Sequence, residues 1–312
     1  MKILLTGGAG FIGSHIQDRY LSLGHRVVVV DDLSFGFKKN INPKAKFYKV
    51  DISNKESLEK IFRKERPEII NHQAALASVV ISTEKPEKTL ESNVTGTYNL
   101  LDLGERYKIK KLIFASTGGA IYGNAKKIPA PETTLPSPLS PYGLSKLLAE
   151  ECIKFFAKNF GINFTILRYA NIYGPRQNEY GEAGVVAIFS GLMHKGKRPT
   201  IFGSGNKTRD YVFVDDAVKA NVLAIKRGKN CIVNIGSGKE TKDIEVFKVI
   251  KKAVGKVAKN IKPIFVPVRP GEVYRVSLDS SLAKKILGWK AEISFKEGVK
   301  KTVEYYRNIK IN

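Results

Sequence analysis

Short apolar runs alternate with longer helical patterns through the first half of the chain, as they do in a parallel sheet covered by helices. The predicted strands are residues 3–6, 26–30, 47–50, 69–71, 111–115 and 163–168. The predicted helices are residues 11–23, 55–64, 89–107 and 141–160. The valines at positions 27–30 suit a central parallel strand, which is buried on both faces. This alternation predicts a doubly wound α/β fold.

The pattern changes after residue 173, where glycine and proline interrupt the chain repeatedly. Residues 211–214 predict a further strand and residues 215–226 a helix, which we expect to rejoin the sheet. Helices are predicted again at residues 241–254, 280–287 and 295–307. We therefore expect a first domain of residues 1–173, rejoined by 211–236, and a smaller C-terminal substrate-binding region of residues 174–210 and 237–312.

A glycine-rich turn joins the first predicted strand to the first helix, with Gly7, Gly10 and Gly13 at regular spacing. Glycines so placed allow a tight bend, close backbone approach to a pyrophosphate and close packing of helix on strand. The helix N-terminus adds free N–H groups and a positive dipole end. Asp31 follows the second strand, where a carboxylate accepts ribose hydroxyls and repels a 2′-phosphate. These residues predict a Rossmann-type sheet that binds NAD rather than NADP.

The pattern Tyr-x-x-x-Lys begins at four positions, Tyr107, Tyr122, Tyr142 and Tyr306. Only Tyr142 follows Ser140-Pro141, a helix-start signal, and opens a long predicted helix. The spacing of four places Tyr142 and Lys146 on one helical face. A nearby ammonium and a bound nicotinamide ring would favour tyrosinate and lower a pKa that starts near 10. Tyr142 is therefore predicted to be a general base.

Two hydroxyl side chains, Ser116 and Thr117, end the predicted strand that should border the nicotinamide. A hydroxyl at this place can hydrogen-bond the reacting oxygen of a substrate and help to pass its proton to Tyr142. The sequence leaves open which of the two has this role.

Taken together, these motifs resemble the extended short-chain dehydrogenase/reductase family, and most closely its UDP-galactose (UDP-glucose) 4-epimerase type. The resembling segments are residues 6–15, 31–34, 51–52, 72–75, 116–123, 141–146, 168–177, 209–216, 234–238, 269–272 and 287–289. The resemblance implies an NAD-dependent enzyme that inverts C4 of a UDP-hexose through a 4-keto intermediate. A UDP-N-acetylhexosamine or UDP-uronate 4-epimerase remains the alternative enzyme.

The resemblance also implies roles for individual residues. The implied cofactor-binding residues are Gly7, Gly10, Phe11, Ile12, Gly13, Asp31, Asp51, Ile52, Ala74, Ala75, Asn93, Tyr142 and Lys146. Among them Asp51 and Ile52 would bracket the adenine, and Asn93 would support the strand that carries the catalytic hydroxyl. The implied substrate-binding residues are Asn171, Arg209 and Arg269 at the UDP end, with Ile201 and Phe202 near the uracil.

Two local features bear on reaction and substrate. Gly118-Gly119 stands where sugar 4,6-dehydratases carry an Asp-Glu pair after the catalytic Thr, so the acid that dehydration needs is missing. UDP-glucuronate decarboxylases carry a Glu in the same segment. In this family a residue four beyond the acidic position of Arg-x-Gly-[Asp/Glu] gates the hexose pocket. Counting from Glu272 gives Val276, which implies room for N-acetyl groups.

The chain is strongly basic, with 53 Lys and Arg, 29 Asp and Glu, and a net charge of +24. This charge suits a polyanion partner, so a basic Rossmann-fold RNA-binding protein is the non-enzymatic alternative. The lysines are spread along the chain, however, and we expect neither a specific nucleic-acid partner nor a membrane. Only Cys152 and Cys231 are present, which favours the cytoplasm. The histidines lack ligand spacing, so no metal is expected, and we expect a homodimer.

Overall fold

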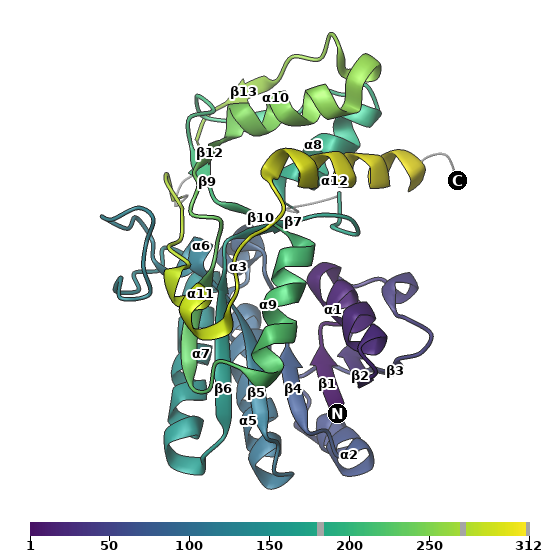
Figure 1. Cartoon of the computed structure of the whole chain (residues 1–312), viewed down its shortest axis with the longest axis vertical. Helices are drawn as coiled ribbons and strands as arrows, with labels where there is room; N and C mark the ends of the chain where they lie inside the picture. Colours follow the sequence, from purple (N-terminus) through teal and green to yellow (C-terminus); the bar gives the residue numbers. More distant parts are fainter. Residues whose placement is uncertain (180–183, 269–272, 310–312) are drawn as a thin grey trace.

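The computed structural model describes residues 1–179, 184–268 and 273–309, and its centre is a parallel seven-stranded sheet (Figure 1). The strand order is β11-β6-β5-β4-β1-β2-β3. The bounds are β1 (Lys2–Thr6), β2 (Arg26–Asp31), β3 (Lys46–Lys49), β4 (Ile69–His72), β5 (Lys111–Thr117), β6 (Asn163–Tyr169) and β11 (Cys231–Ile235). All neighbouring strands are parallel. The predicted doubly wound α/β fold is confirmed.

Helices cover both faces of this sheet. They are α1 (Phe11–Ser22) and α9 (Val214–Lys226) on one face, and α2 (Lys55–Glu65), α5 (Gly96–Arg106) and α7 (Pro141–Phe160) on the other. Successive residues of a strand point to opposite faces, and β1 shows this directly. Ile3 and Leu5 enter the core under α1 and α9, whereas Leu4 enters the core under α2, α5 and α7.

A smaller part of the chain lies above the carboxyl ends of the strands in Figure 1. Its elements are α8 (Val185–His194), β8 (Thr200–Phe202), β9 (Thr208–Arg209), β12 (Thr241–Lys242), α10 (Asp243–Val254), β13 (Ile264–Val266) and α12 (Phe295–Ile309). α8, α10 and α12 pack together, while β8 pairs with β13 and β9 with β12. Shorter elements are η1 (Lys38–Asn40), α3 (Val79–Glu84), α6 (Gly118–Ile121), η3 (Gly255–Ala258) and α11 (Ser281–Leu287). Within the described ranges, no helix is long and apolar enough to cross a membrane.

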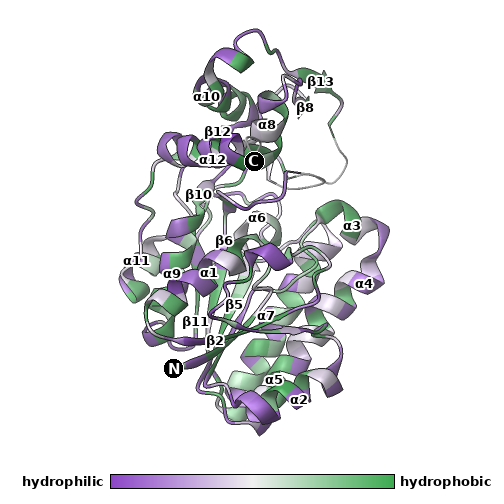
Figure 2. Ribbon diagram, turned by 90° about the vertical axis from the view of Figure 1, so that its right-hand side faces the viewer, coloured by the Kyte–Doolittle hydropathy of each residue, from purple (hydrophilic) through white to green (hydrophobic). Residues whose placement is uncertain are grey.

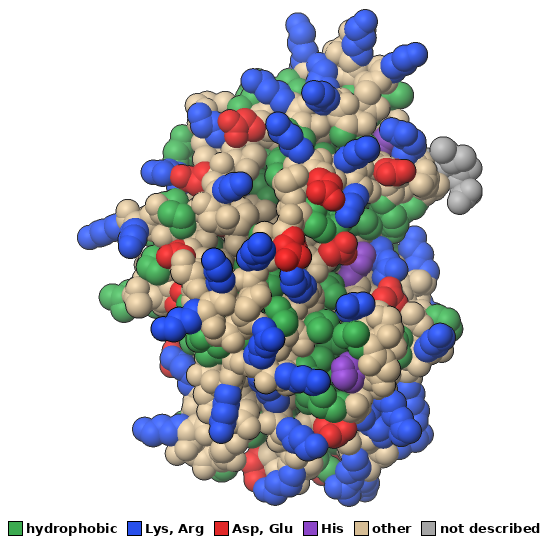
Figure 3. Space-filling model, viewed as in Figure 1, with side chains coloured by type: hydrophobic (Ala, Val, Ile, Leu, Met, Phe, Trp, Pro, Cys, Tyr) green, Lys and Arg blue, Asp and Glu red, His purple; other side chains and the backbone are tan. Residues whose placement is uncertain are grey.

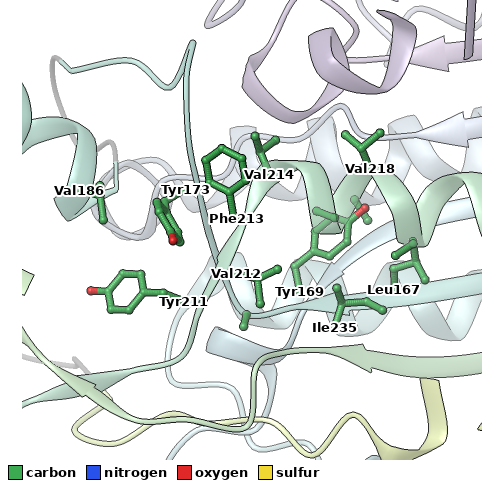
Figure 4. Packing of buried hydrophobic residues seen from close by; sticks show 14 of the residues in the cluster. Leu167, Tyr169, Tyr173, Val186, Tyr211, Val212, Phe213, Val214, Val218 and Ile235 are labelled. Atoms are coloured by element: carbon green, nitrogen blue, oxygen red, sulfur yellow. The ribbon is translucent and has the colours of Figure 1, made fainter. Parts of the chain in front are cut away.

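The strand predicted at residues 211–214 does not join the main sheet. β10 (Tyr211–Phe213) pairs with β7 (Asn171–Tyr173) instead, and β11 is the strand that joins the sheet beside β6. Figure 4 shows Tyr173, Tyr211 and Phe213 pointing into one apolar cluster between the two parts of the chain. The ring of Tyr173 lies 6.1 Å from that of Tyr211 and 5.7 Å from that of Phe213. β10 therefore lies beside β7, with aromatic rings packed around the pair.

The helix predicted at residues 89–107 is interrupted. α4 (Pro86–Leu90) leads into a π-helical turn, η2 (Glu91–Thr95), and only then into α5. Turns of this kind occur often at functional sites. Here the turn carries Asn93, which is fully buried at 2% exposure.

Candidate active site

The predicted cofactor residues gather at the carboxyl ends of the parallel strands, where ligands bind in open α/β sheets. At the end of β1, Gly7 has a φ of +69°, a left-handed conformation suited to glycine. A Cβ on Gly7 would lie 2.6 Å from the backbone N of Ala74, and one on Gly13 would lie 2.1 Å from the carbonyl oxygen of Gly7. Both glycines are therefore required by close backbone approach.

The first turn of α1 is open to an anion. Gly10 is the N-cap and provides no side-chain hydrogen bond, and the first turn has no acidic residue. A Cβ on Gly10 would meet only the carbonyl oxygen of Gly7, at 3.2 Å. The half-buried Phe11 and Ile12 follow directly. A pyrophosphate fits this turn, because a helix N-terminus presents N–H groups and a positive dipole end.

The Asp31 carboxylate at the end of β2 faces the glycine turn. Its Oδ2 accepts a hydrogen bond from the Ala9 N–H, and its Oδ1 accepts one from the Leu33 N–H, each at 2.9 Å. A carboxylate oxygen has a second lone pair, so both oxygens can still accept ribose hydroxyls. A Cβ on Gly36 would lie 3.0 Å from Oδ1. Gly36 keeps this space open, and sequence reasoning did not single it out. The turn and the carboxylate together fit NAD.

The remaining cofactor candidates line the next strand ends. Asp51 is exposed after β3 and accepts the Ser53 N–H at 2.8 Å, whereas Ile52 is buried against Gly96. Ala74 and Ala75 are half-buried after β4. Their position beside the glycine turn follows from the contact between Ala74 and Gly7.

The predicted role of Asn93 needs correction. Its Oδ1 accepts the Leu76 N–H at 2.8 Å, and its Nδ2 donates to the Ser145 Oγ at 2.9 Å. It therefore ties the segment after β4 to α7, and the prediction that it supports the strand carrying the catalytic hydroxyl is wrong. The reason is the π turn, which directs the amide toward α7.

The predicted start of α7 is confirmed, and it places Tyr142 in the first helical turn. Ser140 is the N-cap, its Oγ accepts the Gly143 N–H at 3.1 Å, and Pro141 opens the helix. One turn later, Lys146 is buried at 3% exposure. Its Nζ donates to the Ala115 carbonyl oxygen on β5 at 2.8 Å and lies 4.7 Å from the centre of the Phe114 ring.

The structure separates the two hydroxyl candidates at the end of β5. The Ser116 Oγ donates to Glu150 Oε1 at 2.5 Å, so it faces away from Tyr142. The Thr117 side chain lies close enough to the Tyr142 phenol to lower its pKa, and its Oγ1 also accepts the Ala120 N–H at 3.2 Å. Successive residues of a strand alternate in direction, so only one of the two can face the phenol. The geometry favours Thr117.

The protonation states differ from the expectation for Tyr142. Burial raises the pKa of its phenol to about 12, and the hydrogen bond with Thr117 offsets part of this rise. Burial lowers the pKa of Lys146 to about 7, opposed by the negative charge of Glu150. Desolvation disfavours the charged form of each group. The protein groups alone therefore raise the tyrosine pKa rather than lower it.

The two glycines after Thr117 differ in their surroundings. A Cβ on Gly118 would lie 2.4 Å from Leu278 Cδ1, so a side chain there would clash. A Cβ on Gly119 would meet only ordinary contacts, at 3.7 Å from the Asn171 Oδ1 and the Thr117 Oγ1. Asn171 and Thr117 thus both approach Gly119, and residues 118 and 119 add no acid to this space.

The predicted substrate residues fall in several environments. Arg209 is half-buried and donates to the carbonyl oxygens of Thr208 and Tyr274, at 2.8 and 3.4 Å. Ile201 is a core residue at 2% exposure, whereas Phe202 is half-buried. Arg269 lies outside the described residues. Ile201 can therefore shape a uracil site only through its packing.

The other Tyr-x-x-x-Lys tyrosines have different partners. The Tyr122 hydroxyl donates to Asn234 Oδ1 at 2.8 Å, Tyr306 donates to the Gln177 carbonyl oxygen, and the Tyr107 hydroxyl lies 3.4 Å from Glu59 Oε1. Of the four, Tyr142 is the one that meets Thr117.

Known proteins resemble the chain over its whole length. The model of the NAD dependent epimerase/dehydratase family matches residues 3–236. Mycolicibacterium smegmatis UDP-glucose 4-epimerase is 40% identical over 314 residues, covering 99% of each chain. The crystal structure of Thermotoga maritima UDP-glucose 4-epimerase with UDP-glucose is 48% identical, with a TM-score of 0.97 and 99% of each chain covered. That of Thermus thermophilus UDP-glucose 4-epimerase with NAD is 40% identical, with a TM-score of 0.93, covering 98% of this chain and 99% of that chain.

The matched region contains the glycine turn, Asp31, the end of β5 and the start of α7. The resemblance that these motifs predict is thereby confirmed, and so is NAD as the cofactor. The chain belongs to the NAD dependent epimerase/dehydratase family.

Proposed function

We propose that this protein is an NAD-dependent 4-epimerase that interconverts UDP-glucose and UDP-galactose through a 4-keto intermediate. The observation that carries the proposal is the pairing of Tyr142 with Thr117 at the end of β5, next to Gly118 and Gly119. This arrangement can move one proton, and residues 118–119 supply no acid for dehydration. The names of the relatives above, and the UDP-glucose and NAD in two of their structures, support it.

In this proposal Tyr142 takes the proton of the sugar 4-hydroxyl, and the Thr117 hydroxyl steadies the oxygen. When bound at the glycine turn and Asp31, NAD supplies a hydride acceptor and donor for C4 and a positive charge that favours tyrosinate. The keto sugar turns over in the pocket, and Tyr142 returns the proton to the oxygen of the inverted alcohol. Lys146, held by the Ala115 carbonyl, lies on the same helical face and adds a positive charge there in its ammonium form.

Asn171 and Arg209 would hold the UDP end, together with Arg269. The guanidinium groups suit diphosphate because their hydrogen bonds to anions are charge-assisted. Val276, at 4% exposure, hydrogen-bonds through its N–H to the Thr208 carbonyl oxygen at 3.2 Å, which places it beside Arg209. Its modest size keeps UDP-N-acetylhexosamines as the second substrate class.

The outer faces of α5 and α7 support a homodimer. Tyr98 on α5 and Leu144, Leu148 and Phe155 on α7 are exposed large hydrophobic residues. Figure 2 shows hydrophobic colour along both helices. Exposed apolar patches of this kind mark interaction surfaces. We expect a second copy of the chain to cover them, and we keep the cytoplasm as the predicted location.

The proposal is tested by incubating the purified protein and NAD with UDP-glucose, UDP-galactose, their N-acetyl counterparts and UDP-glucuronate, followed by chromatographic separation of the products. We expect interconversion of UDP-glucose and UDP-galactose, with weaker activity on the N-acetyl pair. Conversion of UDP-glucuronate alone would show that the substrates are UDP-uronates rather than UDP-hexoses. A dehydrated product would show that residues 118–119 do not decide the reaction.

A further inference from the structure

A buried carboxylate lies on α7, on the same helical face as Tyr142 and Lys146. Glu150 follows Lys146 by one helical turn and Tyr142 by two, so that all three lie on one face of α7. Its exposure is 0%. A buried charge is costly unless it is paired and hydrogen-bonded, so its partners show what it does.

The partners of Glu150 come from two neighbouring strands. Its Oε1 accepts the Ser116 hydroxyl of β5 at 2.5 Å. Arg168 of β6, 4% exposed, donates from Nε to Oε1 at 3.0 Å and from Nη2 to Oε2 at 2.6 Å. The carboxylate thus joins α7 to the last residues of β5, and Ser116 is the immediate neighbour of Thr117.

The network continues away from the site. Arg168 Nη1 donates to the Tyr122 hydroxyl at 2.9 Å, and that hydroxyl donates to Asn234 Oδ1 on β11 at 2.8 Å. Replacing a buried ion pair by apolar residues is often neutral or stabilising. Added stability is therefore a weak explanation for this ion pair. A more specific explanation is that Glu150 bonds to Ser116, the neighbour of Thr117, and that its charge acts on Lys146.

We propose that Glu150 is a positioning residue of the active site: it holds the end of β5 against α7 so that Thr117 stays opposite Tyr142. The negative charge of Glu150 also favours the ammonium form of Lys146. The inference rests on the proposed function, because it assigns these side chains a place in the proton transfer. Glu150 itself touches no substrate in this scheme.

Several charged or titratable groups lie around Lys146. On α7 they are Tyr142 and Glu150. The groups from other elements are His72 of β4, Arg168 of β6 and Tyr122, which follows α6. Glu132 interacts electrostatically with Arg168. His72 has its pKa lowered by burial and by the charge of Lys146, and its two ring nitrogens lie within 3.0 Å of the Thr6 and Thr97 hydroxyls. Glu150 is the group that raises the pKa of Lys146.

The test is a ¹³C NMR titration of lysine Cε-labelled protein without cofactor, in the wild type, Glu150→Asp and Glu150→Gln. Lys146 should titrate near 7 in the wild type. Removal of a nearby opposite charge should lower that midpoint by about one pH unit in Glu150→Gln, with Glu150→Asp in between. In Glu150→Gln the positive charge of Arg168 is no longer neutralised, and this also lowers the Lys146 midpoint. A Lys146→Arg spectrum assigns the signal.

Two internal controls separate positioning from general damage. Lys111, at the far end of β5, has a pKa lowered by burial to about 8, and its midpoint should stay in place in every variant. Glu65→Gln removes another buried, paired carboxylate, which bonds with Lys46 and Tyr48. It should lower the melting temperature and leave the Lys146 midpoint unchanged.

Equal Lys146 midpoints in the three proteins would overturn the inference. If Glu150→Gln does not fold, the order of wild type above Glu150→Asp decides instead. With the loaded enzyme, the alkaline limb of the kcat–pH profile should move to lower pH in Glu150→Gln, and kcat at pH 7 should fall about fivefold if the midpoint moves by one unit. A wild type without epimerase activity would refute the proposed function, while the NMR titration would still decide the effect of Glu150.

Discussion

Burial shifts the pKa values of Tyr142 and Lys146, at the start of α7, in opposite directions. It raises the pKa of Tyr142 to about 12 and lowers that of Lys146 to about 7. Near neutral pH the protein alone therefore holds a protonated phenol and an amine close to its midpoint. Small changes in local charge then decide the protonation states on which proton transfer depends.

Tyr142→Phe should lower kcat by on the order of a hundredfold or more, because it removes the group that exchanges the proton. Tyr107→Phe is the matched control, since Tyr107 lies in the same short pattern but its hydroxyl is near Glu59. Steady-state kinetics with UDP-galactose measure both variants. Similar losses in the two would show that Tyr142 is not the proton-transfer residue.

Thr117→Val should lower kcat by about a hundredfold, because it removes the hydroxyl that meets Tyr142 while keeping the side-chain shape. Ser116→Ala should cost less than about tenfold, since Ser116 faces Glu150. KM should change little in either variant. A larger loss in Ser116→Ala would reverse the assignment of the two hydroxyls.

The sequence could place the hydroxyls of Ser116 and Thr117 at a strand end, but it could not show which of them faces Tyr142. The choice depends on strand alternation and on Glu150, which lies 34 residues further along the chain. The sequence could not predict the direction of the pKa shift of Tyr142 either. Its direction depends on burial, which the motif does not report.

α7 carries residues of the proposed proton transfer on one face and exposed apolar residues on the other. Its inner face carries Tyr142, Lys146 and Glu150, and its outer face carries the apolar residues Leu148 and Phe155, 39% and 56% exposed. A partner on the outer face would stiffen the helix that positions the inner one. The proposed dimer would then support the site without contributing a residue to it.

Leu148→Lys combined with Phe155→Lys should convert the dimer to a monomer, because it places two charges in the proposed apolar contact. Multi-angle light scattering gives the mass directly. Leu135→Lys is the control, since Leu135 is 85% exposed in a loop and its replacement should leave the mass unchanged. A wild-type protein that is already monomeric at micromolar concentration would contradict the dimer.

Elements with strong local signals were predictable, and those decided by distant packing were not. Residues 141–160 match α7 because Ser140 and Pro141 mark its start and Gly161 ends it in a left-handed conformation. The π turn around Asn93 leaves no such signal. β11 was missed because Asn234 interrupts its apolar run. The amide of Asn234 is buried with its hydrogen bonds made to Ala130, Asp279 and Tyr122.

Lys and Arg are spread along the sequence, and on the face seen in Figure 3 positive charge is dispersed rather than concentrated. Figure 3 shows Lys and Arg side chains scattered over both the sheet part and the smaller part of the chain. The net charge is +24. A dispersed field of this kind attracts any polyanion weakly and gives no sequence selectivity.

The protein should therefore bind a defined RNA, random RNA and heparin with similar weak affinity, and all three should be lost alike as salt rises. Fluorescence anisotropy between 0.05 and about 0.2 M salt measures this. A complex selective for one RNA that persists at the higher salt would support the RNA-binding alternative instead.

In the proposed reaction, hydrogen leaves C4 of the sugar and returns to the same carbon. UDP-glucose carrying deuterium at C4 tests it most directly, with the protein, NAD and ordinary water, and with the product analysed by NMR and mass spectrometry. We expect UDP-galactose that retains the deuterium at C4, without net accumulation of NADH. Absence of UDP-galactose, or a product whose C4 hydrogen comes from solvent, would contradict it.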